Sequence, residues 1–293
     1  MGTSTSNRGQ NGNTPLVPSW LDDGSLGESP LVPPVGTSHS QSQLPDQDSP
    51  LQKPNQQEQP KPTQQPDPKR FSAPRGNFTR FINSGGTGGG GKNLRHAASS
   101  YVRRSTGGSQ NATARLGSAR QSTARLFSVM GGFANNGISA TAQKHNLGDI
   151  IGKPANVAFL RIMDFVCPEG GKTDDGIARN AYVEALAIIP DLDTKQIESL
   201  TPAEFLAFTE IYMTNVIVGK IENDIGNKLI SLPSDVAQVD NLQEQLRNLV
   251  KGCVADAFTG LKVDIAKVDT TQTQSIVDSV YKTAFDFMEA LED

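Results

Sequence analysis

The chain has 293 residues, a formal net charge of −4 and a hydrophobic fraction of 35%, which is below the usual share for a globular protein. Its two cysteines are too few for a disulfide framework and indicate a reducing compartment. Because we find neither a signal peptide nor an apolar run long enough to span a bilayer, we expect a cytoplasmic protein with no membrane partner.

The charge is distributed unevenly. Residues 1–68 hold three basic and seven acidic side chains, residues 69–145 hold twelve basic and no acidic ones, and residues 146–293 hold twelve basic and twenty-four acidic ones. A cationic block therefore lies between a polar tail and an acidic segment. Any function assigned to the chain has to explain this separation.

Residues 1–68 are rich in Ser, Gln, Pro, Gly and Asn. Such a composition cannot bury enough apolar surface to offset the entropy of ordering, so we predict a long disordered N-terminal tail. One apolar, proline-flanked island interrupts the tail and holds the only tryptophan of the chain. The island either docks a partner protein or is a chance cluster. Its candidate contact residues are Leu16, Val17, Trp20 and Leu21.

The chain begins Met-Gly-Thr-Ser-Thr-Ser. With Gly2 in second position, we expect removal of the initiator methionine, which leaves an unhindered glycine amine on a flexible tether. The same pattern fits an N-myristoylation signal. No second membrane signal lies beside it, however, and one acyl chain anchors only weakly, so we do not favour a membrane anchor.

Residues 69–92 are predicted to form a basic linker rich in Phe, Arg and Gly. Phe71, Phe78 and Phe81 alternate with arginines, a spacing that can stack on nucleobases or guanidinium planes. The glycine tract behind them satisfies a G-x-G-x-x-G template. No predicted strand precedes it, and Asn93 stands where a phosphate-binding loop needs Ser or Thr, so a glycine linker is the preferred interpretation.

Residues 93–145 are predicted to form a basic, arginine-rich helical segment. Small apolar residues and arginines follow helical spacing over 93–104 and 111–130, with a break at Gly107-Gly108. The arginines either bind nucleic acid or pair with acidic groups of this chain or a partner. Pairing is at least as well supported, since acidic side chains outnumber basic ones two to one downstream. The candidate residues are Arg103, Arg104, Arg115, Arg120 and Arg125.

Residues 146–293 are predicted to form an acidic α-helical domain. Apolar residues recur at helical spacing, and no alternating strand pattern occurs. Thr201-Pro202-Ala203-Glu204 is a strong helix start, because it combines a capping box with Pro at the first helical position. For the chain as a whole, basic segment included, we expect an all-α, irregular bundle of about six helices. Within residues 146–293, one helix is expected from Pro154 to Val166 and a second from Asp174 or Asp175 to just before Pro190. A third is expected from Thr201 to Pro233. A fourth is expected from Ser234, with Val236 on its apolar face, and a fifth from about Asp269.

The sequence offers no constellation typical of an enzyme. All three histidines precede the acidic domain, and two distant cysteines have no metal-ligand spacing. Cys167 follows an apolar helix face, Cys253 lies on one, and both are predicted to be packed core thiols. We therefore predict a non-catalytic protein without a metal or cofactor.

Several stretches together resemble the QatB family of the bacterial Qat anti-phage defence system. They lie in the same order over most of the chain. They are MGTSTS, PLVPSWLDD, YVRRSTGGSQNATARLGSAR, DFVCPEGGKTDDGIARNAY, IENDIGNK and LPSDVAQVDNLQEQLRNLVKGCVADAF.

The resemblance implies a non-catalytic adaptor of a multi-protein defence complex. The implied partners are QatA, a large ATPase, QatC, which is similar to QueC-type deazaguanine-synthesising enzymes, and QatD, which is similar to TatD-type DNases. Carried over from related systems, it implies that QatC joins a deazaguanine to the amine of Gly2. The alternative is a nucleic-acid-binding module acting through residues 69–145, which we favour less.

Overall fold

A computed structural model describes residues 69–84, 90–226, 236–269 and 271–292. The predicted disordered tail lies outside these residues. Within them the all-α prediction is confirmed, since strand pairing is limited to one isolated bridge between Pro154 and Gln196. The α-helices of the described ranges are α1 Ser72–Asn83, α2 Gly90–Ser100, α3 Ser109–Ala114, α4 Gly117–Asn136, α5 Ile138–His145, α6 Ala155–Val166, α7 Thr173–Ile188, α8 Pro202–Gly226, α9 Val236–Gly260 and α10 Thr273–Glu289.

The described ranges also contain four shorter helical segments, three between α-helices and one after α10. The first is a π-helix, and the other three are single 3-10 turns. They are η1 Tyr101–Thr106, η2 Ile197–Ser199, η3 Ile265–Lys267 and η4 Ala290–Glu292.

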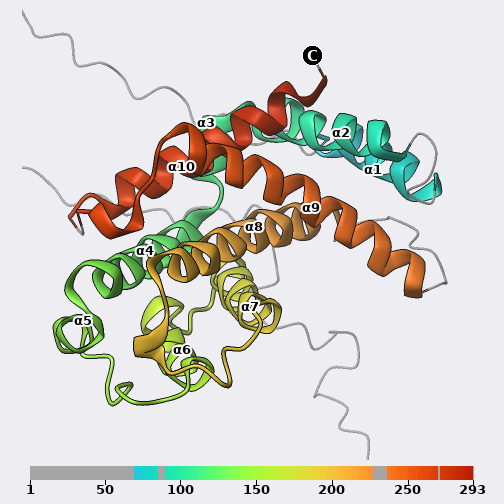
Figure 1. The fold of residues 1–293 in the computed structure, drawn as a ribbon. Coiled ribbons are helices and arrows are strands. Elements are labelled where there is room, and N and C mark those ends of the chain that lie inside the picture. Colours follow the sequence, from blue (N-terminus) through green and yellow to red (C-terminus); the bar gives the residue numbers. More distant parts are fainter. Residues whose placement is uncertain (1–68, 85–89, 227–235, 270, 293) are drawn as a thin grey trace, which may run out of the picture. The chain divides into compact units, whose positions relative to one another are not determined.

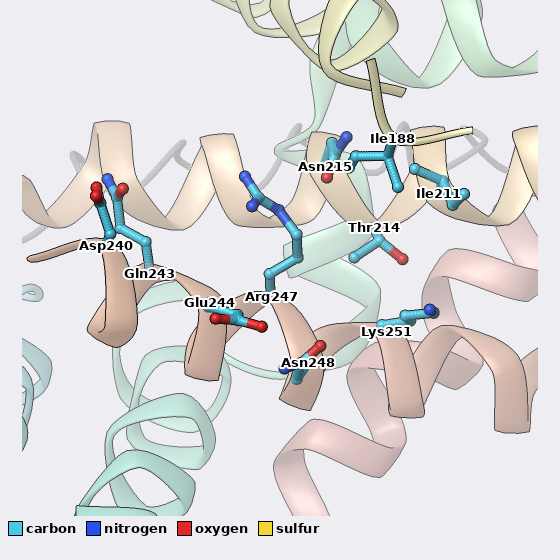
Figure 2. Close-up of a pocket in the computed structure, with 10 residues that line it drawn as sticks. All are labelled: Ile188, Ile211, Thr214, Asn215, Asp240, Gln243, Glu244, Arg247, Asn248 and Lys251. Atoms are coloured by element: carbon cyan, nitrogen blue, oxygen red, sulfur yellow. The ribbon is translucent and has the colours of Figure 1, made fainter. Parts of the chain in front are cut away.

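Helix α8 lies at the centre of the packing. It contacts α4, α7 and α9, while α10 packs on α3, α4 and α9, and α1 packs on α2 (Figure 1). One apolar cluster runs from Phe78 in α1 to Met288 in α10, so the basic and acidic segments share a core. Where α9 crosses α8 near the end of α7, the helices leave a polar pocket of about 410 Å³ (Figure 2).

The number of helices differs from the expected six, because glycines divide the basic segment into short pieces. The predicted break at Gly107-Gly108 is confirmed, with φ angles of +79° and +103°. Gly117, with a φ of +54°, interrupts the helix expected over 111–130 and separates α3 from α4. A non-glycine residue is strained at such φ values, which explains why the chain turns at these positions.

Helix α1 occupies part of the segment expected to be a linker. Its first turn carries Pro74, and its buried face consists of residues three or four positions apart, including Phe78, Phe81 and Ile82. Two of the aromatic rings considered for base stacking are therefore core side chains. The 3–4 spacing was present in the sequence, but the flanking glycines and arginines obscured it.

The helix starts of the acidic segment follow the predicted capping chemistry. The Glu204 backbone N–H donates to Thr201 Oγ1 at 3.3 Å, and the Thr201 N–H donates to Glu204 Oε2 at 2.8 Å, which confirms the capping box of α8. At α7 the prediction that Asp174 or Asp175 is the N-cap is wrong, because the helix begins at Thr173. Asp175 instead occupies the third helical position, where its carboxylate accepts a hydrogen bond from the Lys172 N–H at 3.1 Å.

The apolar face predicted for α9 is wrong at one end. Leu242, Leu246, Cys253 and Phe258 are buried on this face, but Val236, which was also placed on it, is 73% exposed. Val236 is the first residue of the helix as described. Helical periodicity assigns a residue to one face of a helix, but it could not show that this first residue would be left without a covering helix.

Candidate functional site: the Asp224 cluster

The structure separates the predicted site residues into three groups. Gly2 and the island residues Leu16, Val17, Trp20 and Leu21 lie outside the described residues. Arg103 and Arg104 are exposed on the π-helix η1. The remaining three, Arg115, Arg120 and Arg125, are partly buried and contact other parts of the chain.

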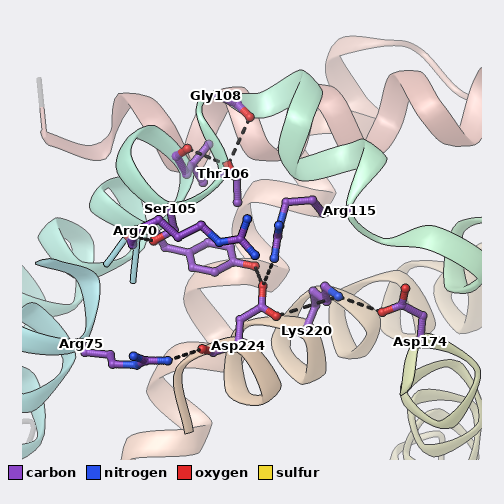
Figure 3. Close-up of polar contacts among 11 residues, drawn as sticks. Arg70, Arg75, Ser105, Thr106, Gly108, Arg115, Asp174, Lys220 and Asp224 are labelled. Atoms are coloured by element: carbon purple, nitrogen blue, oxygen red, sulfur yellow. Dashed lines mark hydrogen bonds and ion pairs between the residues drawn. The ribbon is translucent and has the colours of Figure 1, made fainter. Parts of the chain in front are cut away.

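Arg115 points to Asp224 near the C-terminal end of α8 (Figure 3). The guanidinium Nη2 lies 3.2 Å from Asp224 Oδ2, and the Tyr101 hydroxyl donates to the same oxygen at 3.0 Å. The Asp224 side chain is only 8% exposed. A buried carboxylate is costly unless it is paired and hydrogen-bonded, and here it receives both kinds of contact.

Lys220 extends this cluster along α8. Its ammonium group donates to Asp174 Oδ1 at 2.8 Å and lies 3.9 Å from Asp224 Oδ1. Arg75 of α1 donates to the backbone carbonyl of Asp224 at 3.2 Å. We call Tyr101, Arg115, Asp174, Lys220 and Asp224 the Asp224 cluster. It joins η1 and the α3–α4 connection to α7 and α8, and the Arg75 contact adds α1.

The Tyr101 hydroxyl acts as a donor in this cluster. Burial, and next the neighbouring Asp224 carboxylate, raise the pKa of the phenol well above its ordinary value. The phenol therefore stays protonated and donates to the carboxylate over the physiological pH range.

Phe71 lies among three guanidinium groups beside the cluster. Arg70 lies 4.9 Å from the ring centroid, and Arg75 and Arg115 each lie 5.5 Å from it. The ring also stacks on Tyr101 at 6.4 Å. Of the three phenylalanines for which stacking on bases or guanidinium groups was considered, Phe71 thus stacks on guanidinium groups of its own chain.

Arg120 and Arg125 also make contacts within the chain. Arg120 Nε lies 3.3 Å from Asp278 of α10, and Arg125 donates to the backbone carbonyl of Val166 at 3.0 Å. Together with Arg115, these side chains connect α3 and α4 to the acidic segment. Intramolecular pairing was one of the two alternatives that the charge distribution left open.

Arg103 and Arg104 extend from the last turn of η1. The π-helix adds one residue per turn relative to an α-helix, and such segments are frequent at functional sites. In η1 it places Tyr101 and Val102 in the core and the two arginines on the surface. These two residues are the exposed part of the predicted arginine set.

Both cysteines are buried, as predicted. The Cys167 thiol lies 3.5 Å from the Tyr212 hydroxyl, and burial raises its pKa. Burial also raises the pKa of Cys253 to about 11. A nucleophilic cysteine needs a lowered pKa, and both thiols shift in the opposite direction.

Sequence reasoning missed most of the Asp224 cluster. One signal was present: Lys220 and Asp224 stand four positions apart beside the buried Ile221 and Ile225. Charged residues next to the apolar face of a helix require partners from elsewhere in the fold. The sequence could not name those partners.

Comparison with known protein families identifies the family to which the chain belongs. A model of the family described as "Qat anti-phage system associated protein QatB" matches residues 107–288, which is more than half of the chain. The chain belongs to the QatB family. It is a component of an anti-phage defence system, and the resemblance drawn from the sequence is confirmed. No curated protein and no solved structure matched the chain.

The family match covers α3 to α10 and thus most of the Asp224 cluster. Arg115, Asp174, Lys220 and Asp224 lie within it, whereas Tyr101 and the rest of η1 precede it. Among the described residues, no group of three or more His, Cys, Asp or Glu side chains is arranged to hold a metal ion. None of the described helices has the length and apolarity needed to cross a membrane.

Proposed function

We propose that this QatB-family protein is a non-catalytic adaptor of a Qat anti-phage complex in the cytoplasm. Its helical part binds the QatA-like ATPase, and its N-terminal tail presents Gly2 to the QatC-like partner. A QatD-like DNase completes the assembly. The observation that carries the proposal is the internal use of Arg115, Arg120 and Arg125, whose contacts make the basic segment part of a folded scaffold.

The chemistry proposed at Gly2 is amide formation. An α-amine has a pKa of about 7.7–8.0, so a useful fraction is unprotonated at neutral pH. The amine nitrogen attacks the carbonyl carbon of a deazaguanine carboxylate that the partner has activated, the activating group leaves, and the amine loses a proton. The product is an amide-linked deazaguanine at the N-terminus.

Intact mass spectrometry tests the modification. The protein is purified from cells that carry the whole defence operon and from cells that lack only the QatC-like gene. We expect an added mass on the N-terminal peptide in the first sample alone. Identical N-terminal masses in the two samples would exclude Gly2 as an acceptor.

Co-purification tests the adaptor role. Full-length protein and a variant lacking residues 1–68 are each expressed with the ATPase and with the QatC-like enzyme. We expect the shortened chain to retain the ATPase and lose the QatC-like enzyme. Loss of the ATPase with the tail would contradict the assignment of that contact to the helical part.

A second candidate function is nucleic-acid binding through residues 69–145. The observation that favours it is the exposure of Arg103 and Arg104 on η1. Binding through phosphates weakens steeply with salt. A filter-binding titration at two ionic strengths, with the wild type and an Arg103→Gln/Arg104→Gln variant, decides between the two functions, because an adaptor should have little affinity for DNA at physiological salt.

A further inference from the structure

The pocket between α8 and α9 contains an acceptor and a donor that have no hydrogen-bond partner among the residues that the structure describes. Asn215 of α8 is only 3% exposed, and its Oδ1 atom is buried without a hydrogen-bond partner. Arg247 of α9 carries a buried Nε–H that also has none. Both residues line this pocket (Figure 2), which we call the α8–α9 pocket. Buried polar atoms are rarely left unpaired, so each one calls for an explanation.

The orientation of the Asn215 amide follows from its surroundings. Its Nδ2 group lies 3.4 Å from the Ala181 carbonyl oxygen, which can only accept a hydrogen bond. Exchanging the two ends of the amide would place two acceptors against each other. The atom without a partner is therefore the oxygen, and the pocket requires a donor from its occupant.

The pocket continues toward a second one along α8. Asn215 also lines a pocket of about 440 Å³ between α7 and α8, which includes Glu184. Glu184 and Arg247 form an ion pair at 3.2 Å, so the two pockets meet at this bridge. The bridge is partly exposed to solvent and of the kind that contributes little to stability, so it can open for a ligand.

The charge and shape of the α8–α9 pocket restrict the class of occupant. Two carboxylates and two cations line it, all from α9, so it has no excess of positive charge for a phosphate backbone. At one end Ile188, which is 46% exposed, and Ile211 offer an apolar surface. The charged lining residues are Asp240, Glu244, Arg247 and Lys251.

We propose that the α8–α9 pocket binds an extended peptide segment of a partner protein. A peptide backbone offers an N–H donor and a C=O acceptor in every residue, which are the two groups that Asn215 Oδ1 and Arg247 Nε need. One apolar side chain of the segment packs on Ile188 and Ile211. The volume of about 410 Å³ lies within the usual range for ligand sites. This site deepens the adaptor function by assigning it a partner-binding surface.

A peptide library tests the site on the isolated full-length protein. Displayed random peptides of about twelve residues are selected against the wild type, and the affinities of the enriched peptides are measured by fluorescence anisotropy. We expect enriched peptides to carry one large apolar residue and to bind Asn215→Leu about tenfold more weakly, because the variant loses the acceptor without a large change in volume. Arg247→Lys keeps the charge but lacks Nε and should also weaken binding.

The matched control is Thr214→Val, an isosteric change in the same pocket. The Thr214 hydroxyl donates to the Glu210 carbonyl of its own helix at 2.8 Å, so its removal should leave peptide affinity unchanged. Circular dichroism shows whether the Asn215→Leu variant is folded. If that variant is unfolded, the peptide affinity of Arg247→Lys tests the site instead.

Absence of enriched peptides, or equal binding by the wild type and both site variants, would overturn the proposal and leave the pocket to water. An oligonucleotide that binds the wild type and displaces the selected peptides would overturn it as well. Because the assay contains no Qat partner, its failure is distinguishable from failure of the adaptor function, which the co-purification measures separately.

Discussion

Two polar side chains of α8 have opposite surroundings. The Asp224 carboxylate is contacted by Tyr101, Arg115 and Lys220 of its own chain, whereas the Asn215 oxygen has no donor within the described part of the chain. Both are buried in the fold, so burial does not distinguish them. The difference is whether the chain supplies the partner. A polar group that is paired internally holds helices together, and one left unpaired beside a pocket is available to a ligand.

The comparison predicts that the two positions respond differently to substitution. Removing the charge at Asp224 takes away the carboxylate that Arg115 and Lys220 share. Removing the polar group at Asn215 leaves almost nothing behind.

The largest effect is expected for Asp224→Asn. The change leaves the Arg115 guanidinium and the Lys220 ammonium without their shared carboxylate, and breaking such a buried pair costs about 3–5 kcal/mol. Urea denaturation followed by circular dichroism measures the loss. Asp286→Asn, which removes an exposed i,i+4 pair with Lys282, is the control and should cost less than about 0.5 kcal/mol. Equal losses of unfolding free energy in the two variants would show that the contacts of Asp224 stabilise the fold no more than an exposed ion pair does.

Tyr101→Phe is expected to have an intermediate effect. The variant removes one hydrogen bond to a charged group and keeps the ring that stacks on Phe71. The expected cost is about 1.5–3 kcal/mol in the free energy of unfolding. In a double-mutant cycle, the Tyr101→Phe change should cost much less in the Asp224→Asn background than in the wild type. Strict additivity of the two changes would contradict the shared contact.

Glu204 in the first turn of α8 adds a partly exposed carboxylate to the comparison. Its hydrogen bonds from Lys195 Nζ and the Thr201 N–H lower its pKa from 4.5 to about 2. The folded state therefore binds this proton more weakly than the unfolded state. The stabilisation is complete above about pH 4.5 and is lost as the pH falls toward 2.

A pH series of thermal unfolding compares the wild type with Glu204→Gln. The stability difference between the two proteins should shrink as the pH is lowered from 5 to 2.5. Thr201→Ala, which removes the N-cap, should cost about 1 kcal/mol at neutral pH. A stability difference that is independent of pH would indicate that Glu204 acts only through packing.

Asn215→Leu is expected to have the smallest effect on stability. The substitution gives up one long hydrogen bond to Ala181 and also removes a buried acceptor that had no partner. These two contributions oppose each other, so the free energy of unfolding should stay within about 1 kcal/mol of the wild type. A loss comparable to that of Asp224→Asn would show that Asn215 is a structural residue and would remove the contrast between the two positions.

The sequence determined the features that depend on neighbouring residues. The Thr201–Glu204 capping box and the Gly107-Gly108 break are set within a few positions of the chain, and both are found where they were predicted. The helical class and the buried stripe of α9 follow from periodicity, which is also local. The QatB family was recognisable for the same reason, since it was read from stretches of sequence.

Only the tertiary structure decided what the charged and aromatic side chains contact. Arg115 and Asp224 are 109 positions apart, and the sequence contained no information on which acidic residue would receive which arginine. The formation of α1 by residues 72–83, which were expected to be a linker, likewise depended on packing against α2 and η1. Asn215 became a candidate site because α7 and α9 close around it without supplying a donor. Capping and periodicity act over one or two helical turns, whereas these contacts form only when distant helices pack together, and for that reason the sequence left them undetermined.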